Sequence, residues 1–258
     1  MPFTTVAFFE DQDAGNAYVA VTAIADEHVT VNGDDLQVPE LNQLVAIACG
    51  VGSGGDQLAR LTSPSLRGLV RPHIVPLNGG NDGDVEPDSP QVVMDMRQNP
   101  LLLREDESLN LEIHSDTTAA SKQWGILWLA DGPISPVGGD IRTYRFTNTG
   151  TLTADVWSNG NLTADEDLAV GRYDVVGMRA VSAGLVAARL VPQRGGFRPG
   201  CLGCDDPQDI QHEMFRMGGL GVWLNFASNS IPSVDFLSES ADTDQEVFLD
   251  LIRVSDSL

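Results

Sequence analysis

Short runs of apolar residues alternate with polar residues along most of the chain. The runs are rich in Val, Ile, Thr, Phe and Trp, and Gly, Pro, Asn or Asp interrupts them roughly every 8–12 residues. Apolar residues at helical spacing are almost absent, so the pattern predicts an all-β sandwich or barrel. The predicted strands are Thr5–Glu10, Tyr18–Ile24, His28–Val31, Gln43–Cys49, Gln91–Met96, Leu109–His114, Gln123–Leu129, Ile141–Thr147, Thr151–Trp157, Arg172–Val181, Leu185–Val191, Met217–Phe226, Ser233–Leu237 and Glu246–Val254.

Turn and helix signals are few. The two Asn-Gly steps, Asn32-Gly33 and Asn159-Gly160, predict two-residue hairpin turns, because both central positions of that turn need positive φ. One short helix is predicted over Asp206–Arg216, where Pro207 follows a capping aspartate and suits the first helical position.

The second half of the chain repeats the order of features in the first half. Three pairs of markers lie at nearly one offset: Arg71-Pro72 and Arg198-Pro199 at 127 residues, the two Asn-Gly steps at 127, and Arg60-Leu61 and Arg189-Leu190 at 129. The closing stretches Ser108–Asp131 and Ser233–Asp256 also match, since each has a strand, a Ser/Asp/Thr loop, Gln and a long apolar strand. We interpret this repetition as a tandem duplication of one β-module of about 125 residues, the size of a small domain.

The module boundaries follow from the repeat. Residues 1–131 form the first predicted module, 132–140 a Gly/Pro-rich linker, and 141–258 the second module. An acidic Gly/Pro-rich loop, Pro76–Pro90, interrupts the first module, and Cys201–Arg216 stands at the corresponding point of the second. No run of apolar residues is long enough to span a membrane, and we expect no secretory signal because the first residues lack a basic segment and a long apolar one.

Charge narrows the choice of partners. The chain has 37 acidic and 15 basic residues, a net charge of −22, and Lys122 is its only lysine. A surface this negative repels a phosphate backbone, so we expect no direct binding of nucleic acid. Such a composition is common in halophilic proteins, and the alternative is a GC-rich genome that replaces Lys by Arg.

Few residues suggest site chemistry. Cys201 and Cys204 form a CxxC with His212 nearby, which leaves a metal site, a disulfide or buried thiols open. The acidic loop offers oxygen ligands for calcium at Asn81, Asp82, Asp84 and Glu86, but it lacks the EF-hand pattern and is better explained as a solvated loop.

The remaining polar residues favour architecture over catalysis. No nucleophile elbow, P-loop or zinc-protease motif occurs. The histidines His28, His73, His114 and His212 are widely separated. The arginines Arg60, Arg71, Arg189 and Arg198 occupy matching places in the two modules, and we expect each to satisfy a carboxylate or carbonyl near its own turn.

Two known architectures join two jelly-roll barrels of this size in one chain. Metal-binding bicupins carry an H-x-H motif, which this sequence lacks. The sequence resembles in plan the other architecture, the double jelly-roll major capsid protein of tailless icosahedral viruses with an internal membrane. The features that carry the resemblance are two consecutive β-modules, a Gly/Pro linker, modest length and no catalytic constellation.

This resemblance implies a structural virion protein and not an enzyme. It implies two tandem jelly rolls, with one short helix in the second, that assemble as homotrimers of pseudo-hexameric outline into an icosahedral shell. Neighbouring capsomers, other capsid or penton proteins and a membrane beneath the shell are the implied partners, with assembly in the host cytoplasm and location in the virion. The family has no short diagnostic motif, so we expect no catalytic, cofactor-binding or metal-binding residue.

Two alternatives stay open. A pair of carbohydrate- or ligand-binding β-sandwich modules would expose a row of aromatic side chains, yet Trp124, Trp128, Trp157 and Trp223 all lie in predicted apolar strands. A degenerate bicupin would hold a metal in a pocket of converging polar groups.

Overall fold

The computed structural model describes residues 3–13, 15–26, 29–52, 57–66, 73–74, 85–115, 120–193 and 196–257. Over these ranges the chain is all-β, as predicted, and its two helices are single 3₁₀ turns of three residues. The chain divides between Asp131 and Gly132 into two compact units. The first unit is residues 4–131, and the second is residues 132–258, to which Phe3 is also assigned. None of the described helices has the length and hydrophobicity needed to span a bilayer.

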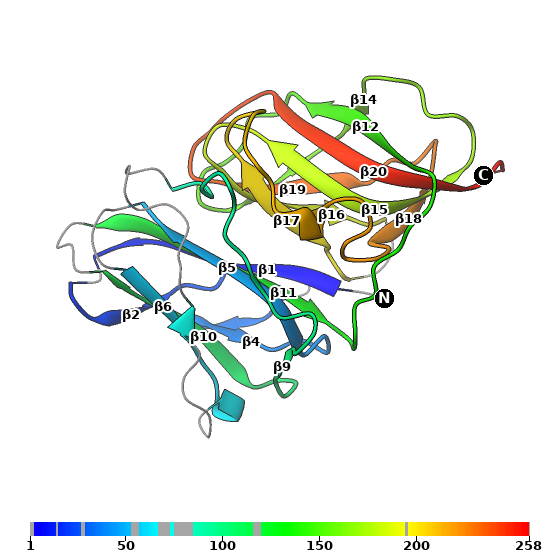
Figure 1. The fold of residues 1–258 in the computed structure, drawn as a ribbon. Coiled ribbons are helices and arrows are strands. Elements are labelled where there is room, and N and C mark those ends of the chain that lie inside the picture. Colours follow the sequence, from blue (N-terminus) through cyan, green and yellow to red (C-terminus); the bar gives the residue numbers. More distant parts are fainter. Residues whose placement is uncertain are drawn as a thin grey trace. The chain divides into compact units, whose positions relative to one another are not determined.

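The first unit contains eleven described strands and one 3₁₀ turn (Figure 1). These elements are β1 Phe3–Gln12, β2 Tyr18–Val21, β3 Val31–Asn32, β4 Asp35–Gln37, β5 Gln43–Val51, β6 Gln57–Thr62, η1 Pro64–Leu66, β7 His73–Ile74, β8 Met94–Asp95, β9 Leu101–Leu102, β10 Ser108–Ser115 and β11 Ser121–Ala130.

The strands of the first unit form two sheets with the connectivity of a jelly roll. One sheet has the order β1-β11-β5-β8, with β9 also pairing with β5. The other has the order β3-β4-β10-β6-β7, with β2 also pairing with β10. The first strand therefore lies beside the last, the chain crosses between the sheets from β4 to β5 to β6, and it does so again from β9 to β10 to β11, which is the double Greek-key pattern of a jelly roll.

The second unit contains nine described strands and the other 3₁₀ turn. These elements are β12 Ile141–Asn148, β13 Trp157–Gly160, β14 Thr163–Ala164, β15 Arg172–Val181, β16 Leu185–Val191, β17 Gly200–Cys204, η2 Glu213–Phe215, β18 Leu224–Ala227, β19 Ser233–Ser238 and β20 Gln245–Ser255.

The second unit repeats the strand order of the first. Its strands β12, β20, β15 and β18 are neighbours in that order, as are β13, β19, β16 and β17. Thus β1 corresponds to β12, β5 to β15, β6 to β16, β7 to β17, β10 to β19 and β11 to β20. A short parallel pairing of β15 with β17, at Ala180–Gly203 and Val181–Cys204, joins these two sets of four strands into one continuous sheet within the second unit.

Strict alternation in β10 places the core of the first unit on one side of its second sheet. Leu109, Leu111 and Ile113 are fully buried, while the residues between them are only partly buried. Each such side chain contributes about 1.5–3 kcal/mol on burial. Gly125 on β11 makes room for this layer, because a Cβ there would collide with Cδ2 of Leu111.

Several local predictions from the sequence were wrong. Asn159-Gly160 is not a hairpin turn but lies inside β13, paired with β19. Gly160 is needed there for close approach, since a Cβ would lie 2.8 Å from the Asn148 side chain. The predicted Asp206–Arg216 helix is reduced to the turn Glu213–Phe215, because this connection is fastened to the neighbouring sheet by side-chain contacts described below.

The strand β17 was missed because its sequence, GCLGC, lacks the β-branched residues that mark a strand. Its glycines allow it to fit between β16 and β15: a Cβ on Gly200 would collide with the Ala188 carbonyl oxygen, and one on Gly203 would collide with that of Leu185. The predicted strand Thr151–Trp157 was also wrong, because β13 begins only at Trp157.

Candidate functional site on the outer sheet faces

The first unit carries an arginine, a carboxylate and an aromatic ring together on the outer face of its second sheet. Arg60 on β6 lies directly opposite Glu112 on β10, and the two form an ion pair. The Arg60 guanidinium carbon lies 3.7 Å from the centre of the Tyr18 ring. Tyr18 on β2 pairs with His114, two residues beyond Glu112 on β10, and its ring contacts that histidine.

The second unit carries the same arrangement at the same register. Arg189 on β16 lies directly opposite Asp235 on β19, with 3.2 Å between Nη2 and Oδ2. The Arg189 guanidinium carbon lies 4.0 Å from the Trp157 ring centre. Trp157 pairs with Leu237, two residues beyond Asp235, as Tyr18 pairs two residues beyond Glu112. Each cluster ties three neighbouring strands together through an ion pair and a cation–π contact.

The two clusters differ in burial. The side chains of Arg60 and Glu112 are 18% and 23% exposed, whereas those of Arg189 and Asp235 are 1% and 6% exposed. The buried Asp235 also accepts from Arg198, at 2.7 Å, and from Asn159 Nδ2, at 2.9 Å. These extra donors offset the cost of removing a carboxylate from water.

The structure gives the positions of the arginines that occupy matching places in the two sequence modules. Arg60 and Arg189 occupy equivalent positions on corresponding strands, and Arg198 joins the second cluster. Arg71 lies outside the described residues.

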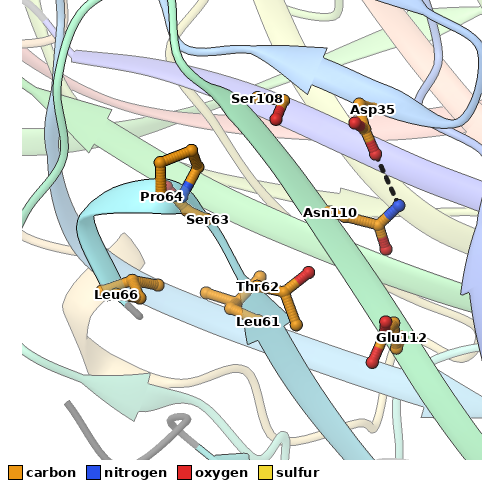
Figure 2. Close-up of a pocket in the computed structure, with 9 residues that line it drawn as sticks. All are labelled: Asp35, Leu61, Thr62, Ser63, Pro64, Leu66, Ser108, Asn110 and Glu112. Atoms are coloured by element: carbon orange, nitrogen blue, oxygen red, sulfur yellow. Dashed lines mark hydrogen bonds between the residues drawn. The ribbon is translucent and has the colours of Figure 1, made fainter. Parts of the chain in front are cut away.

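A cavity lies beside the cluster of the first unit. It has a volume of about 570 Å³ and is lined by Asp35, Leu61, Thr62, Ser63, Pro64, Leu66, Ser108, Asn110 and Glu112 (Figure 2). Thr62 pairs across the strands with Asn110, and Asn110 donates to Asp35 at 2.6 Å. Three strands thus contribute one row of polar side chains: Asp35 from β4, Asn110 from β10 and Thr62 from β6. We call these three residues the polar row.

One wall of this cavity is held by Glu107. Its Oε2 accepts from the Ser65 amide at 3.0 Å and from the Ser65 hydroxyl at 2.7 Å, and its Oε1 accepts from the Arg104 amide at 3.0 Å. Burial raises the pKa of the Glu107 carboxyl, but these hydrogen bonds outweigh it and hold that pKa below its usual value. The turn η1 is therefore fixed against the segment that leads into β10.

A buried carboxylate on β20 fastens the connection after η2 to β20 and to its neighbour β12. Asp250 on β20 is fully buried and accepts two hydrogen bonds from Arg216, at 2.8 and 2.9 Å. It also accepts from the Thr143 hydroxyl at 2.6 Å and from the Met217 amide at 2.9 Å. Burial raises the pKa of Asp250, but these donors together lower it below its usual value.

The linker between the predicted modules packs on this same connection. The Val137 amide donates to the Gly218 carbonyl at 3.0 Å, and the Gly218 amide donates to the Val176 carbonyl at 2.7 Å. Gly218 has a φ of +85°, and a Cβ there would collide with the Val137 carbonyl oxygen. Only glycine fits that backbone and that close approach.

The CxxC residues lie within β17 as buried thiols that are not joined in a disulfide. Burial raises the pKa of Cys201 strongly and that of Cys204 to about 11, which disfavours the reactive thiolate in both. His212 accepts a hydrogen bond from the Met214 amide at 3.3 Å through Nδ1. Among the described residues no three His, Cys, Asp or Glu side chains are placed to hold a metal.

The acidic-loop hypothesis concerns residues that fall mostly outside the described ranges. Asn81, Asp82 and Asp84 lie outside them, as does His28, and only the backbone of His73 is described. The polar row, by contrast, was not singled out from the sequence. The alternation in β10 marks Asn110 as outward-facing, but nothing in the sequence brings Asp35 and Thr62 beside it.

The repeated strand order and the matched clusters define a tandem jelly-roll protein. One solved structure similar to the chain is the crystal structure of the major capsid protein P2 from bacteriophage PM2, at 11% identity over 98% of this chain and 97% of that chain, with a TM-score of 0.27. No family model matches the chain, and no curated protein matches it. The proposals below rest on the chain's own residues.

Proposed function

We propose that this protein is a major capsid protein, a structural virion protein that assembles as trimers into an icosahedral shell. The observation that supports the proposal is the repetition, in one chain, of two jelly rolls with the same strand order and the same Arg–carboxylate–aromatic cluster. Three such chains would present six similar units, and six similar units meet their neighbours in nearly equivalent ways in a hexagonal array.

The chemistry of the clusters also favours a structural role. In each cluster the arginine and the carboxylate neutralise one another, and an aromatic ring covers the guanidinium group. A catalytic acid or base needs a proton-exchanging group that faces a substrate, whereas these groups hold strands together. We therefore propose a protein without enzymatic activity, whose residues maintain a shape.

Assembly of such a shell sets the proposed partners. The chain would bind copies of itself within the trimer and then neighbouring trimers, with other capsid or penton proteins at the vertices and a membrane beneath the shell. Its net charge of −22 disfavours direct contact with the genome. The proposed location is the virion, after assembly in the host cytoplasm.

Mass photometry of the purified protein tests the proposal. The expected species is a trimer of about 83 kDa, three times the chain mass of 27.6 kDa. Negative-stain electron microscopy of that species is expected to show a pseudo-hexagonal outline, and larger closed particles should form as concentration rises. A protein that stays monomeric at micromolar concentration in every salt condition would contradict the proposal.

The structure does not favour the alternative of carbohydrate modules with an aromatic binding face. Trp124 and Trp128 are fully buried and Trp223 is 6% exposed. Trp157 is half-buried and its ring contacts Arg189. The four tryptophans therefore form no exposed row on either unit.

A further inference from the structure

The polar row of the first unit has no counterpart in the second. Because Arg60 corresponds to Arg189 and Glu112 to Asp235, the equivalents of Thr62 and Asn110 are Val191 and Ser233. The register supports this equivalence, since Thr62 pairs with Asn110 and Val191 pairs with Ser233. The second unit thus has an apolar side chain and a short hydroxyl where the first has a hydroxyl and a carboxamide.

The surroundings of the two rows also differ. In the second unit Asn159 donates to both Asp235 and Ser233, so the polar groups there satisfy one another. In the first unit the residue opposite Glu112 on the neighbouring strand is Ala20, which has no polar side chain to offer. The outer face of the first unit is therefore open at the cavity of about 570 Å³, a size typical of small-molecule sites.

Hydrogen-bonding capacity is left over inside that cavity. Asn110 uses its Nδ2 to bind Asp35, while its Oδ1 is shielded from water and has no hydrogen-bond partner among the described residues. The Asp35 carboxylate can accept further hydrogen bonds, and the hydroxyls of Thr62 and Ser108 can both donate and accept. A ligand that fits must offer several donors at close spacing and some acceptors as well.

We infer that this cavity binds a neutral polyhydroxylated ligand, such as a saccharide. Adjacent hydroxyl groups would donate to Asp35 and would accept from the hydroxyls of Thr62 and Ser108. An anion is disfavoured by Asp35 and by the overall charge of −22. A metal ion would find a single uncommitted carboxylate, because Glu112 is paired with Arg60. Pro64 and Leu66 supply an apolar wall, and Glu107 fixes that wall in place.

Saturation-transfer NMR on the full chain tests this inference, with a panel of neutral mono- to trisaccharides as probes and with spermidine and inorganic phosphate as charged comparisons. At least one neutral saccharide is expected to give a transfer signal. The double variant Thr62→Val with Asn110→Ser should weaken that binding by about tenfold or more, because the ligand loses its hydrogen bond to Thr62 and Asp35 loses the Asn110 amide that positions it.

The chain itself supplies the matched controls. The double variant installs the residues that the second unit already carries at the same register, so it should fold, with a thermal unfolding midpoint lowered by only a few degrees through loss of the Asn110–Asp35 hydrogen bond. The reverse double variant, Val191→Thr with Ser233→Asn, should gain no second site, because Arg189 and Asp235 keep that face closed.

Three results would overturn the inference: no neutral saccharide in the panel binds, binding survives in the double variant, or spermidine alone binds. The inference does not depend on the proposed capsid role. The NMR experiment reads ligand binding by the chain in solution, while the test of the capsid proposal reads its assembly, so the two can fail separately.

Discussion

Arg189 lies directly opposite Asp235 across β16 and β19, in a pair whose side chains are 1% and 6% exposed. The equivalent pair of the first unit, Arg60 and Glu112, has the same register but remains partly open to solvent. One arrangement therefore occurs twice in the chain under different degrees of burial. Because burial decides how much an ion pair contributes to folding stability, the same substitution should change the stability by different amounts at the two pairs.

Removal of the carboxylate charge should destabilise the second unit far more than the first. Asp235→Asn leaves Arg189 and Arg198 facing a neutral amide in a buried site, and we expect the free energy of unfolding to fall by about 3–5 kcal/mol. Glu112→Gln alters a partly exposed pair and should cost about 1 kcal/mol or less. Urea denaturation of the two variants measures both losses. Equal losses at the two positions would show that burial does not govern these pairs.

Asp250 should make stability depend on pH. Its pKa in the folded protein lies below that in the unfolded chain, so its ionised form stabilises the fold. That contribution is present above the unfolded pKa, near pH 4, and is lost as pH falls through the lower folded pKa. Asp250→Asn should therefore lower the free energy of unfolding by about 3 kcal/mol at pH 7 and by progressively less at lower pH.

Thermal unfolding from pH 7 to pH 3 checks this prediction, with Asp140→Asn as the comparison because Asp140 forms an exposed ion pair with Arg142. The difference between wild type and Asp140→Asn should stay small throughout. A difference between wild type and Asp250→Asn that did not narrow toward pH 3 would exclude the ionised carboxylate as the cause.

Gly218→Ala should detach the linker from the second unit. The new Cβ would require a positive φ that alanine avoids and would collide with the Val137 carbonyl. Backbone strain alone costs about 1–3 kcal/mol. We expect a lower unfolding midpoint and faster cleavage by thermolysin at the apolar residues of the linker. Gly138→Ala is the matched control, because a Cβ at Gly138 would meet no atom within 4 Å and the cleavage rate should be unchanged.

Assembly should depend on salt if the capsid proposal holds. A charge of −22 on each chain opposes association at low ionic strength. At about 1 M salt the screening length falls to about 3 Å, and that repulsion largely disappears. Light scattering over a sodium chloride series should show particles that grow with salt and dissociate on dilution into low salt. Assemblies equally stable at millimolar ionic strength would contradict this expectation.

The elements predicted best from the sequence are those whose signal is local. The strands Arg172–Val181 and Leu185–Val191 were predicted at the bounds that the structure has, because each is a long run of β-forming residues. The repeat also placed Arg60 and Arg189 in matching positions. Their carboxylate partners could not be assigned, since a partner on another strand depends on register, which is set by the packing of the whole sheet.

The Asn-Gly steps show the same limit. A two-residue turn does join β3 to β4, but its central residues are Gly33, with a φ of +66°, and Asp34, because Asn32 already belongs to β3 and pairs with Asp35. Asn159-Gly160 has the same two residues but pairs within a sheet. A dipeptide reports which backbone conformations are accessible, while tertiary contacts with Asn148 and Asp235 select among them.

The all-β class, the repetition of two halves and most long strands could be read from the amino acids alone, because alternation, turn residues and internal similarity are properties of neighbouring positions and of spacing. Three further relationships became visible only in the folded chain: the two halves share one strand order, Glu112 and Asp235 receive the matching arginines, and the polar row meets beside a cavity. Those relationships join strands distant in the chain, and they arise when burial of apolar side chains fixes one register among many.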